Sequence, residues 1–451
     1  MHADGLRSGG PQADDPRPRG DGLTEGSPHR IPARRFLLAA FGDPGHAFPA
    51  IALGRALVAR GHTVCLQTWS RWQEHVEREG MAFAPAPEYE VWPGGSAMTP
   101  YGAAVRAARE TVPLIRETDP DVVVADVLTV AASLAAQMER RRWATLVPHV
   151  LPTAERGLPP YSVGARLPRT RAGEAMWALW RPLLSRGEER GRLELNEARE
   201  RLGLGVLDYP HGGLSRRLAI VATFPQLEYP RREWDRSIRV TGPLLWEAPC
   251  PEVDLPPGED PLVLVAPSTS QDPEGRLLSA ALEGLAGEAV RVIATTNRGK
   301  RSPAEEAGAV PRGGVARNTR VVDWLSYVST MPDCAAVVCH AGHGTVARAL
   351  ACGVPVIGCP AAGDMAENAA RIAWAGCGVS LPRRLVTARG IRLAVRKVLA
   401  DQGYRREAGH IRGWAERHDG GTLGAAALEA LAGQDDFPAR SSPRWTRTTM
   451  T

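Results

Sequence analysis

The chain has 451 residues, of which 43% are hydrophobic, so it is long enough for two globular domains of ordinary size, each with its own core. Its formal net charge is +5 and its basic residues are scattered among acidic ones, so a nucleic-acid partner is not expected. The seven cysteines form neither a C-x-x-C pair nor a zinc-type Cys/His set, which favours buried free thiols in a reducing cytoplasm.

We expect residues 1–30 and 435–451 to be disordered tails, because both are polar, contain Pro and Arg and lack apolar periodicity. Residues 1–30 also lack the apolar core of a secretory signal. The longest apolar run, 122–138, contains Asp126 and is typical of a buried strand followed by a helix. The sequence therefore predicts a cytoplasmic protein without a membrane span.

The first predicted domain, residues 31–247, alternates between strands and helices. A strand at 35–41 is followed by a Gly/Pro loop at 42–46, a helix at 49–60 and a strand at 63–68. Strand, helix and parallel strand form the repeating unit of an α/β sheet. Further predictions are a helix over 174–204 with an apolar stripe and strands at 121–127, 145–147, 219–223 and 238–240.

A linker is predicted at 248–260, where four prolines interrupt any periodic pattern. The second domain, 261–415, repeats the alternation, and a C-terminal helix within 416–434 is expected to pack back on the first domain. Its predicted strands are 262–266, 290–295, 320–322, 335–339 and 354–357, and its helices are 275–285, 345–351 and 365–375. The fold class is α/β, with two doubly wound Rossmann-like domains facing a cleft, the usual place for a ligand.

The strongest local feature lies where the strand at 335–339 meets His340, Gly342, Gly344 and Thr345. A Gly-rich turn at a helix N-terminus presents backbone N–H groups and the positive end of the helix dipole to an anion. The ring of His340 and the hydroxyl of Thr345 can donate further hydrogen bonds to a phosphate. The residues alone leave two interpretations equal, a diphosphate site or a tightened corner of the fold.

Residues 340–371 read HAGHGTVARALACGVPVIGCPAAGDMAENAAR. Their His-x-Gly-x-Gly-Thr turn, Gly-Val-Pro strand, Gly-Asp pair and Asn-Ala-x-Arg helix resemble the donor-binding signature of family 1 glycosyltransferases of the GT-B fold. The resemblance implies a bacterial natural-product enzyme that uses a UDP- or dTDP-sugar. It assigns the diphosphate to His340, Gly342, Gly344 and Thr345, and the sugar hydroxyls to Asp364.

Further donor contacts follow from the same resemblance. Trp324 lies where the family stacks the nucleotide base, and its alternative is a core aromatic at a strand end. Ser268 and Thr269 follow the first strand of the second domain, where the family places a hydroxyl near the diphosphate. Their alternative is an ordinary turn or cap role.

Two positions depart from the family pattern. Arg348 stands where the family often has a Glu that holds the ribose hydroxyls, and Met365 stands where it has a Gln beside the sugar. A thymidine donor lacks the 2′-hydroxyl, and a deoxysugar has fewer hydroxyls to hold. These departures lead us to expect a dTDP-deoxysugar as the donor, with a UDP-sugar as the alternative.

The acceptor half contains Gly45-His46-Ala47-Phe48-Pro49, which resembles the family's Gly-His-x-x-Pro, whose His is the general base. Asp126 matches the carboxylate that orients this base. A capping or packing role is the alternative for His46, and a helix N-cap for Asp126. His149, which follows another strand, is a less favoured alternative base.

The resemblance therefore implies an inverting nucleotide-sugar-dependent hexosyltransferase of secondary metabolism, such as antibiotic biosynthesis. The acceptor is expected to be a hydroxyl of a hydrophobic small molecule, and the protein a monomer or homodimer. No Asp-x-Asp motif lies near the turn, so no metal and no other cofactor is expected. The alternatives are an epimerase or phosphorylase on the same fold, or a non-catalytic partner protein, against which the presence of His46 counts.

The acceptor-binding segments cannot be told from core segments by sequence. Aromatic and apolar residues gather at 69–72, at 89–92 and around Trp177 and Trp180 of the predicted helix. They suit a hydrophobic acceptor, but aromatic stripes at helical spacing are more often core.

Overall fold

The computed structural model describes residues 32–434, apart from 88–99, 154, 156, 209–212, 233, 251, 269–271, 273 and 298–315. Both predicted tails lie outside the described residues. By their contacts, the described residues from Arg34 onward form one compact unit. In the described part of the chain, no helix has the length and apolar character needed to cross a membrane.

The first sheet is parallel, with seven strands in the order β3-β2-β1-β4-β5-β6-β7. Because the chain starts in the middle and winds outward in both directions, this is a doubly wound sheet. All five residues of β4 are buried, as expected for a strand covered on both faces. The strands are β1 (Arg35–Ala39), β2 (Thr63–Thr68), β3 (Ala82–Pro85), β4 (Val122–Asp126), β5 (Arg142–Val147), β6 (Ala219–Val221) and β7 (Ile238–Val240).

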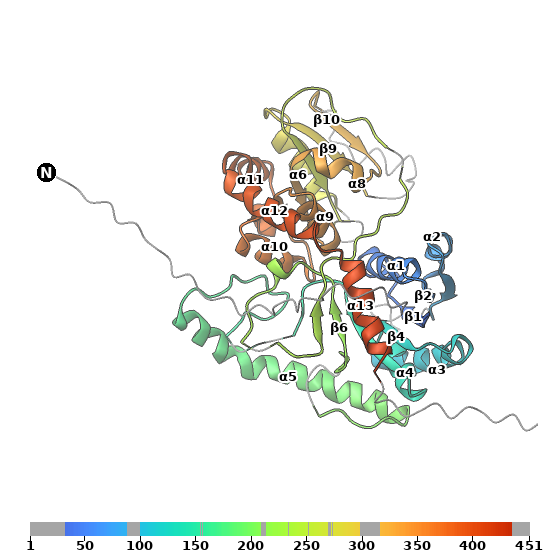
Figure 1. The fold of residues 1–451 in the computed structure, drawn as a ribbon. Coiled ribbons are helices and arrows are strands. Elements are labelled where there is room, and N and C mark those ends of the chain that lie inside the picture. The colour runs from blue at the N-terminus through green and yellow to red at the C-terminus, as the bar shows by residue number, and fades with distance from the viewer. Residues whose placement is uncertain are drawn as a thin grey trace, which may run out of the picture. The chain divides into compact units, whose positions relative to one another are not determined.

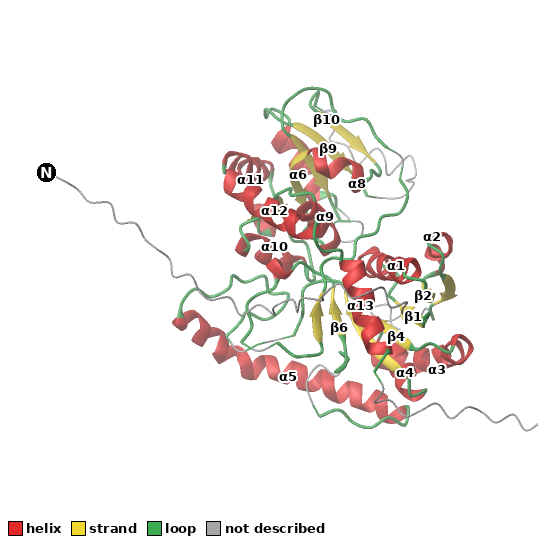
Figure 2. Cartoon of the chain, in the orientation of Figure 1, coloured by secondary structure: helices red, strands yellow, loops and turns green. Residues whose placement is uncertain are grey.

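Helices flank this sheet, as Figures 1 and 2 show. The longest, α5, packs against α3 and has a Thr170 side chain that accepts a hydrogen bond from Gly173 N at its start. The α-helices are α1 (Pro44–Ala59), α2 (Gln73–Arg78), α3 (Pro100–Thr118), α4 (Val130–Met138) and α5 (Arg171–Arg201). Short 3-10 turns are η1 (Ser70–Trp72) and η2 (Pro225–Leu227).

The second sheet has six parallel strands in the order β10-β9-β8-β11-β12-β13, again wound outward from its first strand. The strands are β8 (Leu262–Ala266), β9 (Arg291–Thr295), β10 (Thr319–Val322), β11 (Cys334–Cys339), β12 (Val356–Gly358) and β13 (Gly378–Ser380). The helices are α6 (Arg276–Leu285), α8 (Tyr327–Thr330), α9 (His343–Ala351), α10 (Met365–Trp374), α11 (Ala388–Ala400), α12 (Gln402–Ala415) and α13 (Gly420–Ala432), with turns η3 (Met331–Asp333) and η4 (Arg383–Leu385). The structure thus has the predicted two-sheet α/β fold class.

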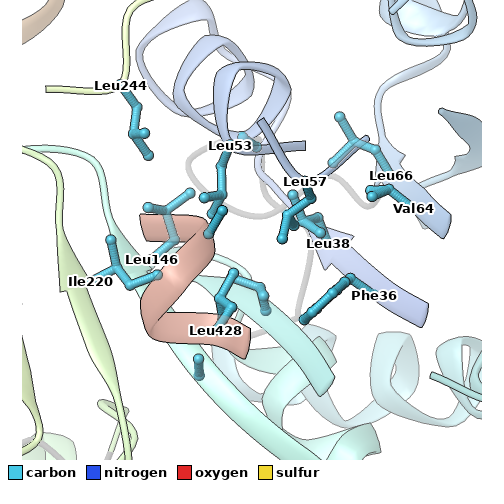
Figure 3. Close-up of a cluster of buried hydrophobic side chains, with 14 of the residues drawn as sticks. Phe36, Leu38, Leu53, Leu57, Val64, Leu66, Leu146, Ile220, Leu244 and Leu428 are labelled. Atoms are coloured by element: carbon cyan, nitrogen blue, oxygen red, sulfur yellow. The ribbon is translucent and has the colours of Figure 1, made fainter. Parts of the chain in front are cut away.

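The C-terminal helix α13 packs against α1, beside the first sheet. Leu428 of α13 is fully buried in one cluster with Leu53 and Leu57 of α1 (Figure 3). On the same helix Glu429 accepts two hydrogen bonds from Arg60, each 2.7 Å, and its Oε1 lies 2.7 Å from His62 Nε2. Both apolar burial and this charged contact hold the chain's last helix on the first half.

Several predicted elements shift in the structure. The Gly/Pro segment 42–46 is not a loop throughout, because α1 begins at Pro44, where a missing N–H costs no helical hydrogen bond. The first strand ends at Ala39 and not at 41. The apolar stripe of α5 is largely exposed, with Leu179 at 81% exposure, so it is not a core face among the described residues.

Candidate active site

The side chains of His46 and Asp126 meet at the carboxyl ends of β1 and β4, which are neighbours in the first sheet. Asp43 O accepts hydrogen bonds from His46 N (2.9 Å) and Ala47 N (2.8 Å), and this first turn of α1 carries the imidazole. Asp126 is the last residue of β4 and only 2% exposed. His46 Nδ1 lies 2.6 Å from Asp126 Oδ2 and 3.0 Å from Oδ1.

This contact fixes the orientation of the His46 ring and the nitrogen that carries its proton. The carboxylate of Asp126 accepts the Nδ1–H, which leaves His46 Nε2 as the site that can take a proton. Asp126 Oδ1 also accepts a hydrogen bond from Leu128 N at 2.7 Å, which holds the carboxylate in place. Burial opposes a charge on His46, but the hydrogen bond and the charge of Asp126 outweigh it and raise the pKa of His46 above its usual value.

His149 follows β5 and lies beside His46, with ring centroids 6.4 Å apart and planes at 85°. Its Nδ1 is 2.8 Å from Val150 O and 3.2 Å from the hydroxyl of Tyr161, whose ring stacks on it. Burial lowers the pKa of His149, so this ring stays neutral. Of the two histidines that the sequence offers as bases, His46 therefore favours the protonated form and His149 the neutral form.

In the second half, the turn after β11 has an unusual backbone. Ala341 is fully buried and has φ of 60°, a conformation that non-glycine residues rarely adopt. Gly342 is the N-cap of α9, and His343 is its first residue. The predicted Gly-rich turn at a helix N-terminus is therefore present, two residues earlier than the sequence predicts for the helix.

His340 is oriented by backbone, because Ser268 N donates a hydrogen bond to His340 Nδ1 at 2.8 Å. The ring proton consequently lies on Nε2, where a phosphate oxygen could accept it. Burial lowers the pKa of His340, although the nearby charge of Asp272 opposes this, so the ring is neutral. Asp272 Oδ2 is 3.5 Å from Nε2, so a negative charge already borders the predicted diphosphate site.

The two glycines of the turn leave space beside the α9 N-terminus. A Cβ added at Gly342 or Gly344 would meet no heavy atom of the protein within 4 Å, and neither residue has positive φ. Neither packing nor backbone conformation in the described residues therefore requires glycine here. A bulky anion that approaches the backbone N–H groups would explain both glycines.

Asn368 of α10 connects the turn with the predicted sugar-binding carboxylate. Its Nδ2 donates to Ala341 O and to Asp364 Oδ2, each at 3.0 Å. One buried amide thus fixes both the strained residue of the turn and Asp364. The charge of Asp364 acts on both His46 and His149, which brings the predicted groups of the two halves within electrostatic range.

The other predicted donor contacts are less defined. Trp324 follows β10 and is 49% exposed, so its ring is available for stacking. Thr345 is half-buried in the first turn of α9, whereas Thr269 lies outside the described residues. Burial lowers the pKa of Arg348, although the charge of Glu247 opposes this.

The predicted acceptor segments give a mixed picture. Gly42 is needed for packing, because a Cβ there would collide with the Trp69 ring. Trp72 Nε1 donates to Gly42 O at 2.7 Å. The segment 89–92 lies outside the described residues, and Trp180 is exposed on α5.

Sequence reasoning missed Asp272, Tyr161 and His343. His343 occupies a variable position of the signature, and its Nε2 is 3.2 Å from Ala222 O, just after β6. Burial lowers the pKa of His343 to about 4, so the ring is neutral and donates this hydrogen bond. A histidine inside a Gly-rich turn is a signal that could have indicated such a contact. Within the described ranges, no three His, Cys, Asp or Glu side chains are grouped to hold a metal ion.

Two family models match the chain. Residues 36–150 match the glycosyltransferase family 28 N-terminal domain, which covers His46, Asp126 and His149. Residues 291–417 match the model described as erythromycin biosynthesis protein CIII-like, C-terminal domain, which covers the turn and Asp364.

Relatives and a solved structure agree with these matches. The 4′-demethylrebeccamycin synthase of Lentzea aerocolonigenes is 28% identical over 410 residues, 84% of this chain and 94% of that protein. A PGL/p-HBAD biosynthesis glycosyltransferase of Mycobacterium tuberculosis is 30% identical over 311 residues, 65% of this chain and 67% of that protein. The crystal structure of the glycosyltransferase VinC in complex with dTDP is similar in fold, with a TM-score of 0.66 at 18% identity, over 88% of this chain and 99% of that one.

Proposed function

Since the chain belongs to the nucleotide-sugar-dependent glycosyltransferases with the GT-B fold, we propose that it transfers a sugar to a hydroxyl of a hydrophobic small molecule with inversion at the anomeric carbon. The observation that carries this proposal is the 2.6 Å contact between His46 and Asp126. The charge of Asp364, from the proposed donor half, also acts on His46. The name of one relative, the 4′-demethylrebeccamycin synthase that matches 84% of this chain, supports a secondary metabolite as the acceptor.

The reaction is a direct displacement. His46 Nε2 takes the proton of the acceptor hydroxyl as its oxygen attacks the anomeric carbon, and Asp126 stabilises the imidazolium that forms. The bond from the anomeric carbon to the diphosphate breaks, and the nucleoside diphosphate leaves with the electron pair. Backbone N–H groups at the α9 N-terminus and the His340 Nε2–H receive the charge that develops on it.

The base is tested with His46→Ala, which should lower kcat by about 10²- to 10⁴-fold. His410→Ala is the matched control, because His410 Nδ1 also pairs with a carboxylate, Glu407 at 3.2 Å, but on exposed α12. The readout is dTDP release from a dTDP-sugar with and without a phenolic acceptor. Full turnover by His46→Ala, or equal release without an acceptor, contradicts the proposal, and the second outcome indicates hydrolysis of the donor. Conversion of the dTDP-sugar to an isomer without an acceptor and without dTDP release would favour an epimerase, which the comparisons do not favour.

The donor is a dTDP-deoxysugar. Arg348 and Met365 replace the residues with which the family holds a ribose 2′-hydroxyl and a fully hydroxylated sugar, and VinC was solved with dTDP. Calorimetry should show tighter binding of dTDP than of UDP, and tighter UDP binding contradicts this assignment. Met365→Gln should raise kcat/KM for dTDP-glucose relative to a dTDP-deoxysugar.

The reaction needs no metal. The N–H donors at the start of α9 and on His340 take the place of a cation at the leaving diphosphate. Turnover should therefore persist after treatment with a chelator and dialysis. Loss of turnover that added Mg²⁺ restores contradicts this part of the proposal.

A further inference from the structure

We propose that His149 and Tyr161 bind a second hydroxyl group of the acceptor, beside the hydroxyl that reacts at His46. His149 Nε2 accepts its hydrogen, and the Tyr161 O–H donates to its oxygen. The proposal deepens the proposed function and rests on it, because it needs His46 as the base. It defines the substrate class as acceptors with two hydroxyl groups. It also gives His149 a role other than that of an alternative base.

The tautomer of His149 is set by its own loop. Its Nδ1 lies 2.8 Å from Val150 O, and a carbonyl can only accept, so Nδ1 carries the proton. Nε2 then has a lone pair, and no hydrogen bond to it is found among the described residues. Because the side chain is only half-buried, an acceptor molecule can reach this atom.

Tyr161 complements this lone pair. Its hydroxyl lies 3.2 Å from His149 Nδ1, and its ring stacks on the imidazole at 5.8 Å with planes 28° apart. Since Nδ1 carries the proton, the tyrosine oxygen is the acceptor in this contact and keeps its own O–H for another partner. Burial raises the pKa of Tyr161, with the charge of Asp364 adding to this, so the hydroxyl stays protonated. The pair thus presents one acceptor and one donor.

The two imidazoles have distinct roles because their surroundings differ. His46 has a carboxylate on Nδ1 that stabilises its charged form, whereas His149 has a neutral carbonyl there. Burial and the proximity of His46 disfavour a charge on His149, against the weaker pull of Asp364 and Asp126. With ring centroids 6.4 Å apart and perpendicular planes, both rings border one region. His46 takes a proton during the reaction, whereas His149 only binds the acceptor molecule.

The test compares two acceptor probes, 2-naphthol and 2,7-dihydroxynaphthalene, which differ by one O–H group. The wild type should bind the diol about 3- to 10-fold more tightly, the effect of one or two neutral hydrogen bonds. His149→Phe and Tyr161→Phe keep the stacked rings and remove the polar atoms. Each should raise KM for the diol much more than it changes kcat, and the acid limb of the pH profile should keep the position set by His46.

His149→Gln retains an acceptor atom and should restore part of the preference. His418→Phe is the matched control, because His418 also stacks on an aromatic ring, Trp414 at 4.5 Å, and lies exposed just beyond the C-terminal end of α12. Thermal unfolding of each variant shows whether it is folded.

Three outcomes overturn the proposal. The first is that the wild type binds the two probes equally well, or binds neither of them detectably. The second is an unchanged preference in both folded Phe variants. The third is a loss of kcat in His149→Phe as large as that in His46→Ala, which would make His149 a base. Failure of the proposed function is distinct, since it appears as full turnover in His46→Ala whatever the probe preference.

Discussion

At the scale of single residues, the pair of His46 and Asp126 determines the pH at which the proposed base works. His46 can accept a proton only when neutral, and Asp126 raises its pKa, so kcat should rise with pH through a value above the usual 6.5 or so of histidine. Asp126→Asn removes the charge that raises this pKa. We expect the acid limb of the profile to move to lower pH and kcat to fall by about 10²- to 10⁴-fold.

The control for this variant is Asp121→Asn, just before the start of β4, where Asp121 Oδ2 accepts a hydrogen bond from Arg35 N at 2.9 Å. It should leave the profile unchanged. An acid limb that moves to higher pH in Asp126→Asn, or stays where it was, contradicts the assigned role of Asp126. The measurement is kcat against pH between about 5 and 9, across the range of histidine titration.

Asn368 provides a second prediction at this scale. Its amide holds Ala341 O and Asp364 Oδ2, so Asn368→Ala frees the strained turn and the carboxylate together. We expect the Kd for dTDP-sugar to rise about tenfold or more and the free energy of unfolding to fall by about 1–3 kcal/mol. Calorimetry and denaturant unfolding measure the two effects.

Asn318→Ala is matched to it in chemistry. Asn318 Nδ2 donates to backbone carbonyls, among them Val290 O at 2.8 Å, away from the turn. It should lose stability without losing affinity for the donor. Similar affinity losses in both variants would mean that Asn368 acts only through general stability.

The residue scale also shows what the sequence could predict of the site. His46, Asp126 and His340 stand next to Gly and Pro or at strand ends, in local patterns that can be read along the chain. Their partners are not local, because Ser268 N reaches His340 across 72 positions. Asp272 and Tyr161 come from loops, where no periodicity says which way a side chain points.

At the scale of elements, one substitution in α9, Gly344→Ala, is predicted to raise stability and to weaken nucleotide binding. Gly344 lies inside the helix, and a Cβ there meets no heavy atom within 4 Å. Gly344→Ala should therefore stabilise the fold by about 0.4–1 kcal/mol, because alanine costs less entropy in a helix. If the diphosphate lies against this turn, the same methyl group should weaken nucleotide binding severalfold.

Gly409→Ala in α12 separates the two effects, since a Cβ there is equally unopposed but lies in a different helix from the turn. It should raise Tm without changing the Kd for dTDP. Unchanged nucleotide affinity in Gly344→Ala would contradict the assignment of the diphosphate to this end of the helix. Scanning calorimetry and titration calorimetry give the two quantities.

The strands were easier to predict than the helices, for a physical reason. Parallel strands covered on both faces are continuous apolar runs, and the buried strand β8 has the predicted bounds. The bounds of β2 and of the edge strand β7 also agree with the prediction. The helix α3 was not predicted, since its sequence contains Pro113 and is polar on average. The exposed apolar residues of α5 show the limit of periodicity, because a stripe predicts a face but not whether anything covers it.

At the scale of the whole molecule, Arg371 of α10 connects the second half with the loop after β6. Its guanidinium donates to Glu367 Oε1 at 2.8 Å, Leu227 O at 2.8 Å and Glu228 Oε2 at 3.0 Å. It also lies 4.1 Å from the centre of the Tyr229 ring. Only 3% of its side chain is exposed, so water cannot replace these partners.

Arg371→Met should lower the free energy of unfolding by about 3–5 kcal/mol, because it leaves two buried carboxylates without their cation. Urea unfolding measures the change. The control is Arg396→Met, because the Arg396 side chain is 62% exposed and its partner Glu288 keeps Arg392 as a second cation. It should leave stability nearly unchanged. A small loss of stability in Arg371→Met would mean that the two carboxylates become neutral by taking up protons. In that case the loss of stability should grow as the pH rises, because the carboxylates then ionise.

The return of α13 to the first half has a consequence for building chimeric enzymes. Leu428 packs in the core of the first half and Glu429 pairs with Arg60 there, although both are encoded after the whole second half. In gene architecture, the second half is therefore an insertion within the first half. A chimera that exchanges donor specificity needs two crossovers, one between β7 and β8 and one between α12 and α13, whereas a single crossover would join a foreign last helix to the native α1.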